Sequence, residues 1–186
     1  MTRAYCNRCK RALRGCICKY AVPIVNKNFI TILRHPSEIK NIKGTAALLA
    51  LSLSNIKLLD GEIFSSSEVL KTEMDNYLLF PSETSLKVSE SPKSESRAKN
   101  FIFIDGTWKK AYKILQLNSF LKEINHLSIE LNEESLYSQI RKQKSGGLST
   151  LESVTYTLKE FEKEITLEEL EASFKKFIEN LKSLST

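Results

Sequence analysis

Apolar and polar residues follow one another in blocks that predict alternating strands and helices. The segments 29–33, apolar except for Thr31, and 101–104 have the length and composition of buried strands, and the segments 77–80 and 126–131 predict two more. Residues 45–54 are apolar almost all round, which predicts a buried helix. This alternation predicts an α/β fold with a mainly parallel sheet and helices on both faces.

A further helix is predicted to begin at Trp108, a short turn after the strand at 101–104. Its apolar positions recur at helical spacing and therefore indicate a stripe that faces the core: Trp108, Ala111, Tyr112 and Leu115. Residues 68–76 carry a weaker helical pattern. Residues 82–99, which include six serines and Pro92, predict a mobile surface loop.

Two capping boxes mark helix starts near the end of the chain. Ser149 with Glu152 has the spacing of the first, and Thr166 with Glu169 repeats it. The last helix also carries an apolar stripe, formed by Leu167, Leu170, Phe174, Phe177, Ile178 and Leu181. The second half of the chain is therefore expected to end in two helices.

The composition is that of one globular domain: 186 residues, of which 41% are hydrophobic and 27% charged. No apolar stretch has the length of a membrane span or the form of a signal peptide, so we expect a soluble, cytoplasmic protein without membrane contact. The six glycines form neither a G-x-G-x-x-G turn nor a Walker loop. A dinucleotide fold of the usual kind and a P-loop NTPase are therefore excluded.

Positive charge is concentrated towards the N-terminus. Residues 1–43 contain ten Lys and Arg side chains against a single acid, Glu38, whereas the remainder carries 18 basic and 21 acidic side chains. A field of that sign suits a polyanion such as nucleic acid, because contacts with phosphates supply most of the non-specific affinity. A well-solvated basic end is the alternative.

All four cysteines lie in this basic segment, as Cys6-x2-Cys9-x6-Cys16-x-Cys18. Four thiolates can surround one tetrahedral ion, so the spacing predicts a structural zinc knuckle over residues 1–22, followed by a larger unit at 23–186. A disulfide framework and an iron–sulfur cluster are the alternatives. A reducing cytoplasm disfavours the first, and the tight final pair of cysteines disfavours the second.

Several motifs occur in an order that resembles the DTW domain family, which takes its name from Asp-x-Thr-Trp. Besides the cysteines, the matching segments are His35-Pro36-Ser37-Glu38, Leu79-Phe80-Pro81, Asp105-Gly106-Thr107-Trp108 and Gly146-Gly147-Leu148-Ser149-Thr150-Leu151-Glu152. The resemblance covers nearly the whole chain up to about residue 160. One departure is Gly44-Thr45, where most members of the family have Asn-Thr.

The bacterial members that the chain resembles are tRNA-uridine aminocarboxypropyltransferases. The resemblance therefore implies transfer of the 3-amino-3-carboxypropyl group of S-adenosylmethionine to N3 of a tRNA uridine, which leaves 5′-methylthioadenosine. It also implies a relationship to the SPOUT class and a knot in the C-terminal part of the sheet, an exception to the rule against knots.

Asp105 follows directly on the predicted strand 101–104, and ligands of parallel sheets bind beyond the carboxyl ends of the strands. In the implied reaction, uridine N3 is a poor nucleophile until it loses its proton. Asp105 is therefore a candidate for the base, or for the carboxylate that faces the sulfonium. The alternative is that Asp105 and Thr107 merely cap the following helix.

The remaining site residues are assigned mainly on the resemblance. The implied contacts with S-adenosylmethionine are Leu79, Phe80, Pro81, Thr107, Trp108, Gly147, Leu148 and Thr150. The expected contacts with tRNA are Arg8, Arg11, Arg14, Arg34, His35, Lys43 and Arg141. Structural alternatives stand beside them: a satisfied loop histidine at position 35, a solvated basic loop around Arg141, and a plain loop capped at Ser149.

Two other function classes stay open at this stage. SPOUT relatives mostly move methyl groups, so the chain could be an RNA methyltransferase. A basic zinc knuckle needs no chemistry, so the chain could also be a catalytically silent RNA-binding module. The sequence predicts neither the particular tRNA nor the oligomeric state.

Overall fold

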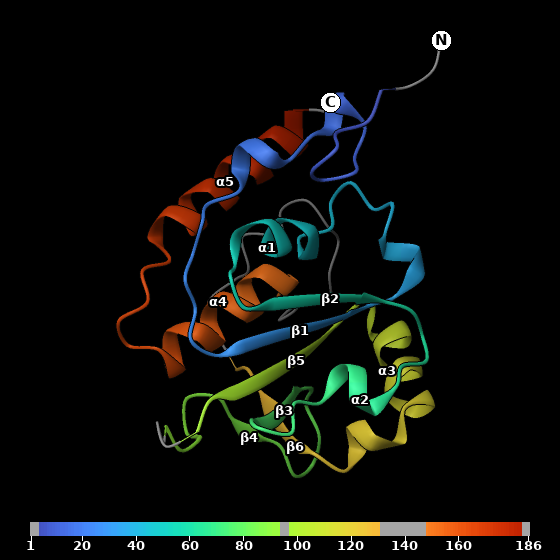
Figure 1. Cartoon of the computed structure of the whole chain (residues 1–186), viewed down its shortest axis with the longest axis vertical. Coiled ribbons are helices and arrows are strands. Elements are labelled where there is room, and N and C mark those ends of the chain that lie inside the picture. The colour runs from blue at the N-terminus through green and yellow to red at the C-terminus, as the bar shows by residue number, and fades with distance from the viewer. Residues whose placement is uncertain (1–3, 94–96, 131–147, 184–186) are drawn as a thin grey trace.

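The computed structural model describes residues 4–93, 97–130 and 148–183 (Figure 1). In this part of the chain, six strands form one sheet in the order β2-β1-β5-β3-β6-β4, and every neighbouring pair is parallel. The strands are β1 (Phe29–Arg34), β2 (Ile56–Asp60), β3 (Asp75–Leu79), β4 (Leu86–Lys87), β5 (Lys99–Asp105) and β6 (Asn125–Ser128).

Helices connect the strands and follow the sheet. The α-helices are α1 (Ala46–Ser52), α2 (Ser66–Val69), α3 (Trp108–Leu117), α4 (Thr150–Phe161) and α5 (Glu168–Ser183). Short 3-10 turns are η1 (Leu13–Gly15), η2 (Cys18–Tyr20), η3 (Pro36–Glu38) and η4 (Ser119–Lys122). None of the helices in the described ranges combines the length and apolar character that crossing a bilayer requires.

The two faces of the sheet carry separate hydrophobic layers. Phe101 and Phe103 of β5 belong to the layer that contains α1, α4 and α5, whereas Ile102 belongs to the layer that contains α2, α3 and η4. This division follows from the strand geometry, because successive side chains point to opposite faces. Figure 1 shows α1 and α4 on one side of the strands and α2 and α3 on the other. The predicted α/β fold with helices on both faces is confirmed.

The C-terminal helices also agree with the prediction. Ser149 and Glu152 form the expected capping box at the start of α4. The predicted apolar stripe of α5 is buried from Leu167 to Leu181. The expected knot depends on the path of residues 131–147, which lie outside the described part of the chain.

Three local predictions were wrong or incomplete. Instead of a helix over 68–76, α2 ends at Val69 and β3 begins at Asp75, because the Asn76 side chain bonds both the N–H and the carbonyl of Lys71 and closes a turn. The edge strand β2 was not predicted. The loop expected at 82–99 contains β4, and Val88 beside it is only 1% exposed.

The end of the cysteine segment packs on the rest of the molecule. The Tyr20 ring meets the edge of the Phe177 ring in α5 at 5.5 Å between centroids, and Ser173 donates to the Tyr20 carbonyl at 2.9 Å. Figure 1 shows this N-terminal stretch running beside α5. Ile17 and Tyr20 are both buried in the same core as α1 and α5, so this segment does not stand apart from the sheet.

Candidate functional site

Parallel register brings three of the predicted site segments to one edge of the sheet. Arg34 at the end of β1 pairs with Asp105 at the end of β5, and the N–H of His35 donates to the Asp105 carbonyl at 3.0 Å. On the other side of β5, Leu79 pairs with Phe103, so Phe80 and the residues after it continue at the same edge. We call this side of the sheet, formed by the carboxyl ends of the strands, its carboxyl edge. Ligands of parallel sheets bind there.

Asp105 is half-buried at this edge, and its carboxylate is held from a distant part of the sequence. Its Oδ1 accepts a hydrogen bond of 2.6 Å from the Thr150 hydroxyl, in the first residue of α4. The N-cap of α3 is Thr107, whose side chain makes no capping hydrogen bond. The alternative that Asp105 and Thr107 merely cap α3 therefore finds no support.

The start of α4 is fixed by backbone and side-chain contacts. The Ser149 hydroxyl accepts from the N–H of Glu152 at 3.2 Å, and the Glu152 carboxylate accepts from the N–H of Ser149 at 2.8 Å. The N–H of Leu151 donates to the buried Thr45 hydroxyl at 3.2 Å. Leu148 is half-buried just before this turn, whereas Gly147 lies outside the described residues.

Trp108 contradicts the prediction that it faces the core first. Its side chain is 59% exposed, and its ring meets the edge of the Phe80 ring at 5.8 Å between centroids. The buried stripe of α3 consists of Ala111, Ile114 and Leu115 instead. Trp108 therefore lies at the border of that stripe, where its ring is available to a ligand.

The His35 side chain has partners on both ring nitrogens. Nδ1 accepts from the Ser37 N–H at 3.2 Å, so in the neutral ring Nε2 carries the proton and donates to Glu62 at 2.7 Å. The Glu62 carboxylate also accepts from Lys113 at 2.6 Å. The hydrogen bond from Lys113, and then that from His35, hold the pKa of Glu62 below its usual value.

A second acid beside His35 was not assigned a role from the sequence. Glu38 is 5% exposed and accepts from Lys110 of α3 at 2.9 Å and from Asn41 at 2.7 Å. Its place in the His-Pro-Ser-Glu motif was the only signal for it. Together with the Lys113–Glu62 pair, this contact ties α3 to the loops that follow β1 and β2.

The basic residues expected to contact tRNA differ in what they already bind. Arg11 donates to the carbonyls of Ile42 and Gly44 at 2.9 and 3.0 Å, and so fixes the cysteine segment to the loop before α1. Arg34 forms a two-pronged ion pair with Asp60 at 2.6 and 2.9 Å. Both guanidinium groups therefore already bind acceptors within the protein before any RNA is bound.

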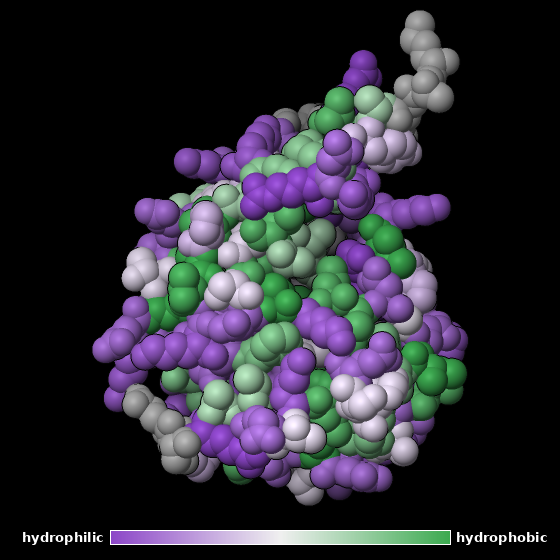
Figure 2. Space-filling model, viewed as in Figure 1, coloured by the Kyte–Doolittle hydropathy of each residue, from purple (hydrophilic) through white to green (hydrophobic). Residues whose placement is uncertain are grey.

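The other predicted tRNA contacts are less constrained. Arg8 is exposed and makes one long bond of 3.4 Å to the Leu51 carbonyl. Arg14 is exposed and has no hydrogen-bond or ion-pair partner among the residues the structure describes. Lys43 is half-buried, and Arg141 lies outside those residues. Figure 2 shows hydrophilic side chains, with hydrophobic ones between them, at the end of the molecule where the N-terminal segment lies.

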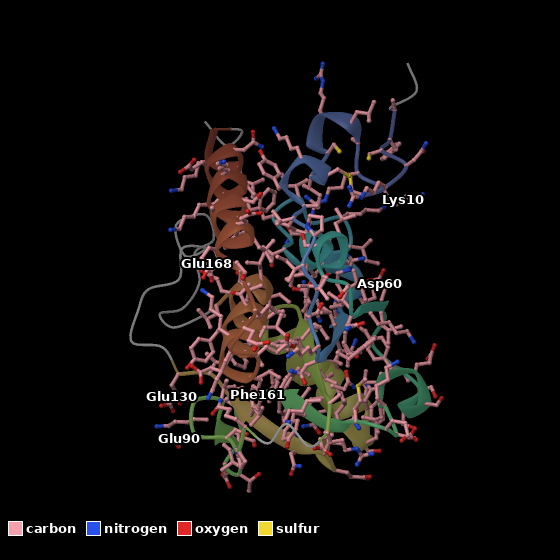
Figure 3. The ribbon with its side chains drawn as sticks, turned by 60° about the vertical axis from the view of Figure 1, so that its left-hand side comes forward. Lys10, Asp60, Glu90, Glu130, Phe161 and Glu168 are labelled. Atoms are coloured by element: carbon pink, nitrogen blue, oxygen red, sulfur yellow. The ribbon has the colours of Figure 1, made fainter. Side chains whose placement is uncertain are left out.

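The four cysteine sulfurs gather into one cluster, all within 4.8 Å of one another. The Cys6–Cys18 and Cys9–Cys16 sulfur pairs are 3.7 and 3.8 Å apart. A tetrahedral zinc with Zn–S bonds of about 2.3 Å places its sulfurs about 3.8 Å apart, so the donor set fits that ion. The sulfur atoms lie near the labelled Lys10 in Figure 3.

The thiol pKa values in the cluster are shifted in opposite directions. Hydrogen bonds from the N–H groups of Cys9 and Arg8 lower the pKa of Cys6 to about 6. Burial and the neighbouring thiols raise the pKa of Cys18 to about 12. Four thiolates in one small space repel one another, so a cation is required for all of them to ionise together.

These features define a parallel α/β protein with a four-cysteine cluster and a carboxylate at the carboxyl edge of its sheet. The DTW domain matches residues 3–182, and the chain belongs to this family. Three animal proteins, each named tRNA-uridine aminocarboxypropyltransferase 2, are similar to it; bacterial relatives had been expected.

The relatives match most of the chain but not all of their own length. The proteins of Macaca fascicularis and Mus musculus are 27% identical over 90% of the chain, and that of Drosophila melanogaster is 30% identical over 84%. The chain spans 59% of the length of the first two and 66% of the third. No solved structure is significantly similar to the chain.

Proposed function

We propose that the chain transfers the 3-amino-3-carboxypropyl group of S-adenosylmethionine to N3 of a uridine in tRNA and releases 5′-methylthioadenosine. The observation that carries this proposal is the Asp105 carboxylate at the carboxyl end of β5, which is oriented by Thr150. It lies three residues before the exposed Trp108, whose ring contacts the half-buried ring of Phe80. The names of the similar animal proteins describe transfer of an aminocarboxypropyl group to a tRNA uridine, which supports this proposal.

The proposed reaction requires a base and residues that position the two substrates. S-adenosylmethionine supplies a carbon activated by the sulfonium next to it. In the proposed step, Asp105 takes the proton from N3 and the N3–carbon bond forms. The carbon–sulfur bond breaks, and its electron pair goes to sulfur to give a neutral thioether. In the alternative role, Asp105 faces the positive sulfur and stabilises its binding.

The residues around Asp105 supply positioning in this proposal. Trp108 and Phe80 offer aromatic surfaces on which an adenine or uracil ring can stack. Leu148 and Thr150, at the fixed start of α4, lie on the side from which the carboxylate is held. Leu79, Pro81, Thr107 and Gly147 complete the proposed cofactor contacts.

The cysteine cluster is proposed to hold one structural zinc ion. Cys6, Cys9, Cys16 and Cys18 would fill all four positions, which leaves no open position for a substrate. The ion would shape the basic segment that meets tRNA. We further propose that the protein acts in the cytoplasm, where thiols stay reduced.

Radiolabel transfer tests the proposed reaction directly. The protein is incubated with bulk tRNA and S-adenosylmethionine labelled in either its methyl or its carboxyl carbon. Carboxyl label in the RNA, with 5′-methylthioadenosine in solution, is the expected result. Methyl label in the RNA would make the chain a methyltransferase. Neither label, with tRNA still bound, would make it a binding module.

A further inference from the structure

We propose that the outward face of α3 is a platform for a single-stranded stretch of the substrate RNA. Bases next to the target uridine stack on Trp108 and Tyr112, and a phosphate lies at Lys109. This inference rests on the proposed function for the identity of the RNA, but the surface itself is argued from its own side chains.

Two exposed aromatic rings lie on the outward face of α3. Trp108 is 59% exposed and Tyr112 is 57% exposed, although both were expected to face the core. They are four residues apart on α3 and therefore lie on the same side of the helix. Phe80 contacts Trp108 from the sheet edge. The three rings thus extend from the carboxyl edge of the sheet, where Asp105 lies, along the outward face of α3.

The same helix also carries positive charge. The helix contains three lysines and no acidic residue. Lys110 and Lys113 pair with Glu38 and Glu62, which accounts for two of the three positive charges. Lys109 is exposed and has no hydrogen-bond or ion-pair partner within the described ranges. It is therefore a cation left available beside the three rings.

Aromatic faces combined with available positive charge fit single-stranded RNA better than a protein partner. Unpaired bases stack on aromatic rings while lysines neutralise the backbone, and modified or sequence-recognised uridines are reached in such unpaired segments. The core of a protein interface, in contrast, is depleted in charge. The exposed side of α3 carries Lys109, Lys113 and Gln116 next to its two rings.

The only tryptophan of the chain provides a direct signal for this surface. We expect bulk tRNA, and a short oligouridine, to quench Trp108 fluorescence in protein already saturated with S-adenosylmethionine. Saturation ensures that any stacking of adenine on Trp108 is complete before the titration, so further quenching reports an RNA base on the part of the ring that the cofactor leaves exposed. Absence of RNA-dependent quenching while RNA binds by filter assay would overturn the inference.

Substitutions on the face provide the second measurement. Tyr112→Ala should weaken tRNA binding roughly 5- to 150-fold, the usual effect of losing one stacked base, whereas Tyr112→Phe should keep it near wild type. Lys109→Glu should weaken binding and reduce its dependence on salt. The matched control is Lys175→Glu, an exposed lysine of α5 on the opposite layer, which should change little.

The outcomes separate this inference from the proposed function. Quenching and a Tyr112→Ala defect without any transfer of label would retain the platform and remove the reaction. Normal transfer at limiting tRNA by both Tyr112→Ala and Lys109→Glu would retain the reaction and remove the platform. If Tyr112→Ala instead converts a dimer to a monomer with unchanged RNA affinity, the face is an interface between copies and the inference is overturned.

Discussion

The cysteine segment and the carboxyl edge of the sheet reach their shapes by different means. Between residues 4 and 22, the described residues bury few apolar side chains, chiefly Ile17 and Tyr20, and four thiols converge instead. At the sheet edge, Asp105 ends a strand whose residues 99–103 are all buried. The proposed zinc ion would therefore shape the first region, whereas the register of the sheet shapes the second.

This difference implies that the two regions can be damaged separately. Loss of the ion should loosen the segment that is shaped by it and leave the parallel strands in place. Loss of the Asp105 carboxylate should leave both structures intact and remove chemistry alone. The following variants test how far that independence extends.

The largest effect is expected at the metal. The purified protein should contain about one zinc per chain, and Cys9→Ser or Cys16→Ser should lose it and unfold the segment, because structural zinc contributes on the order of 10 kcal/mol. Metal content and hydrogen exchange report this loss. Binding of S-adenosylmethionine should persist. Stoichiometric iron, or an unchanged fold after chelation, would contradict the prediction.

The next effect is expected at Asp105. Asp105→Asn is nearly isosteric and can still accept from Thr150, so the melting temperature should stay close to that of the wild type. If Asp105 is the base, transfer should fall by roughly 10²–10⁴ with little change in S-adenosylmethionine affinity. If the carboxylate faces the sulfonium, affinity should fall along with the rate.

The control for this variant is Asp75→Asn at the opposite edge of the sheet. Asp75 begins β3 and pairs at the surface with Arg97, so its loss should leave the rate near wild type. Near wild-type transfer by well-folded Asp105→Asn protein would mean that the base lies elsewhere.

The two regions also differ in what the sequence could predict. Strands β1 and β5 were predicted because each contains a short, mainly apolar run that ends at a polar residue. Strand β4 was missed because two residues inside a serine-rich segment form no pattern of their own. The helix expected at 68–76 failed because Asn76 bonds the backbone of Lys71, a contact that periodicity does not report.

The site shows the same limit. Position at a strand end was enough to place Asp105 at the carboxyl ends of the strands, and cysteine spacing was enough to predict a cluster. The Thr150 contact joins residues far apart in sequence, so only the resemblance hinted at it. Trp108 was misplaced because a helical stripe has borders, and spacing alone does not tell a border residue from a buried one.

Two arginines of the cysteine segment, Arg11 and Arg14, differ in whether they bind the rest of the protein. Arg11→Gln removes two bonds to carbonyls that fix the cysteine segment, so the free energy of unfolding should fall by about 1–2 kcal/mol. Arg14→Gln removes an exposed cation, so stability should stay constant while tRNA affinity and its salt dependence decrease. Denaturant unfolding measures the effect of each variant on stability, and tRNA binding at several salt concentrations measures its effect on RNA affinity. Equal stability losses would contradict this division.

The smallest effect is expected at Lys10, which has a φ of 58° in the turn that follows Cys9. Its N–H donates to the Cys6 carbonyl at 2.9 Å, so the turn belongs to the cluster itself. Left-handed backbone costs a residue with a Cβ roughly 1–2 kcal/mol, and glycine avoids this cost but gains freedom when unfolded. Lys10→Gly should therefore slow zinc release to a chelator by about two- to fivefold. Lys10→Ala removes the charge but keeps the Cβ, so it should release zinc at the wild-type rate. Equal release rates for Lys10→Gly and Lys10→Ala would contradict a backbone cost at this turn.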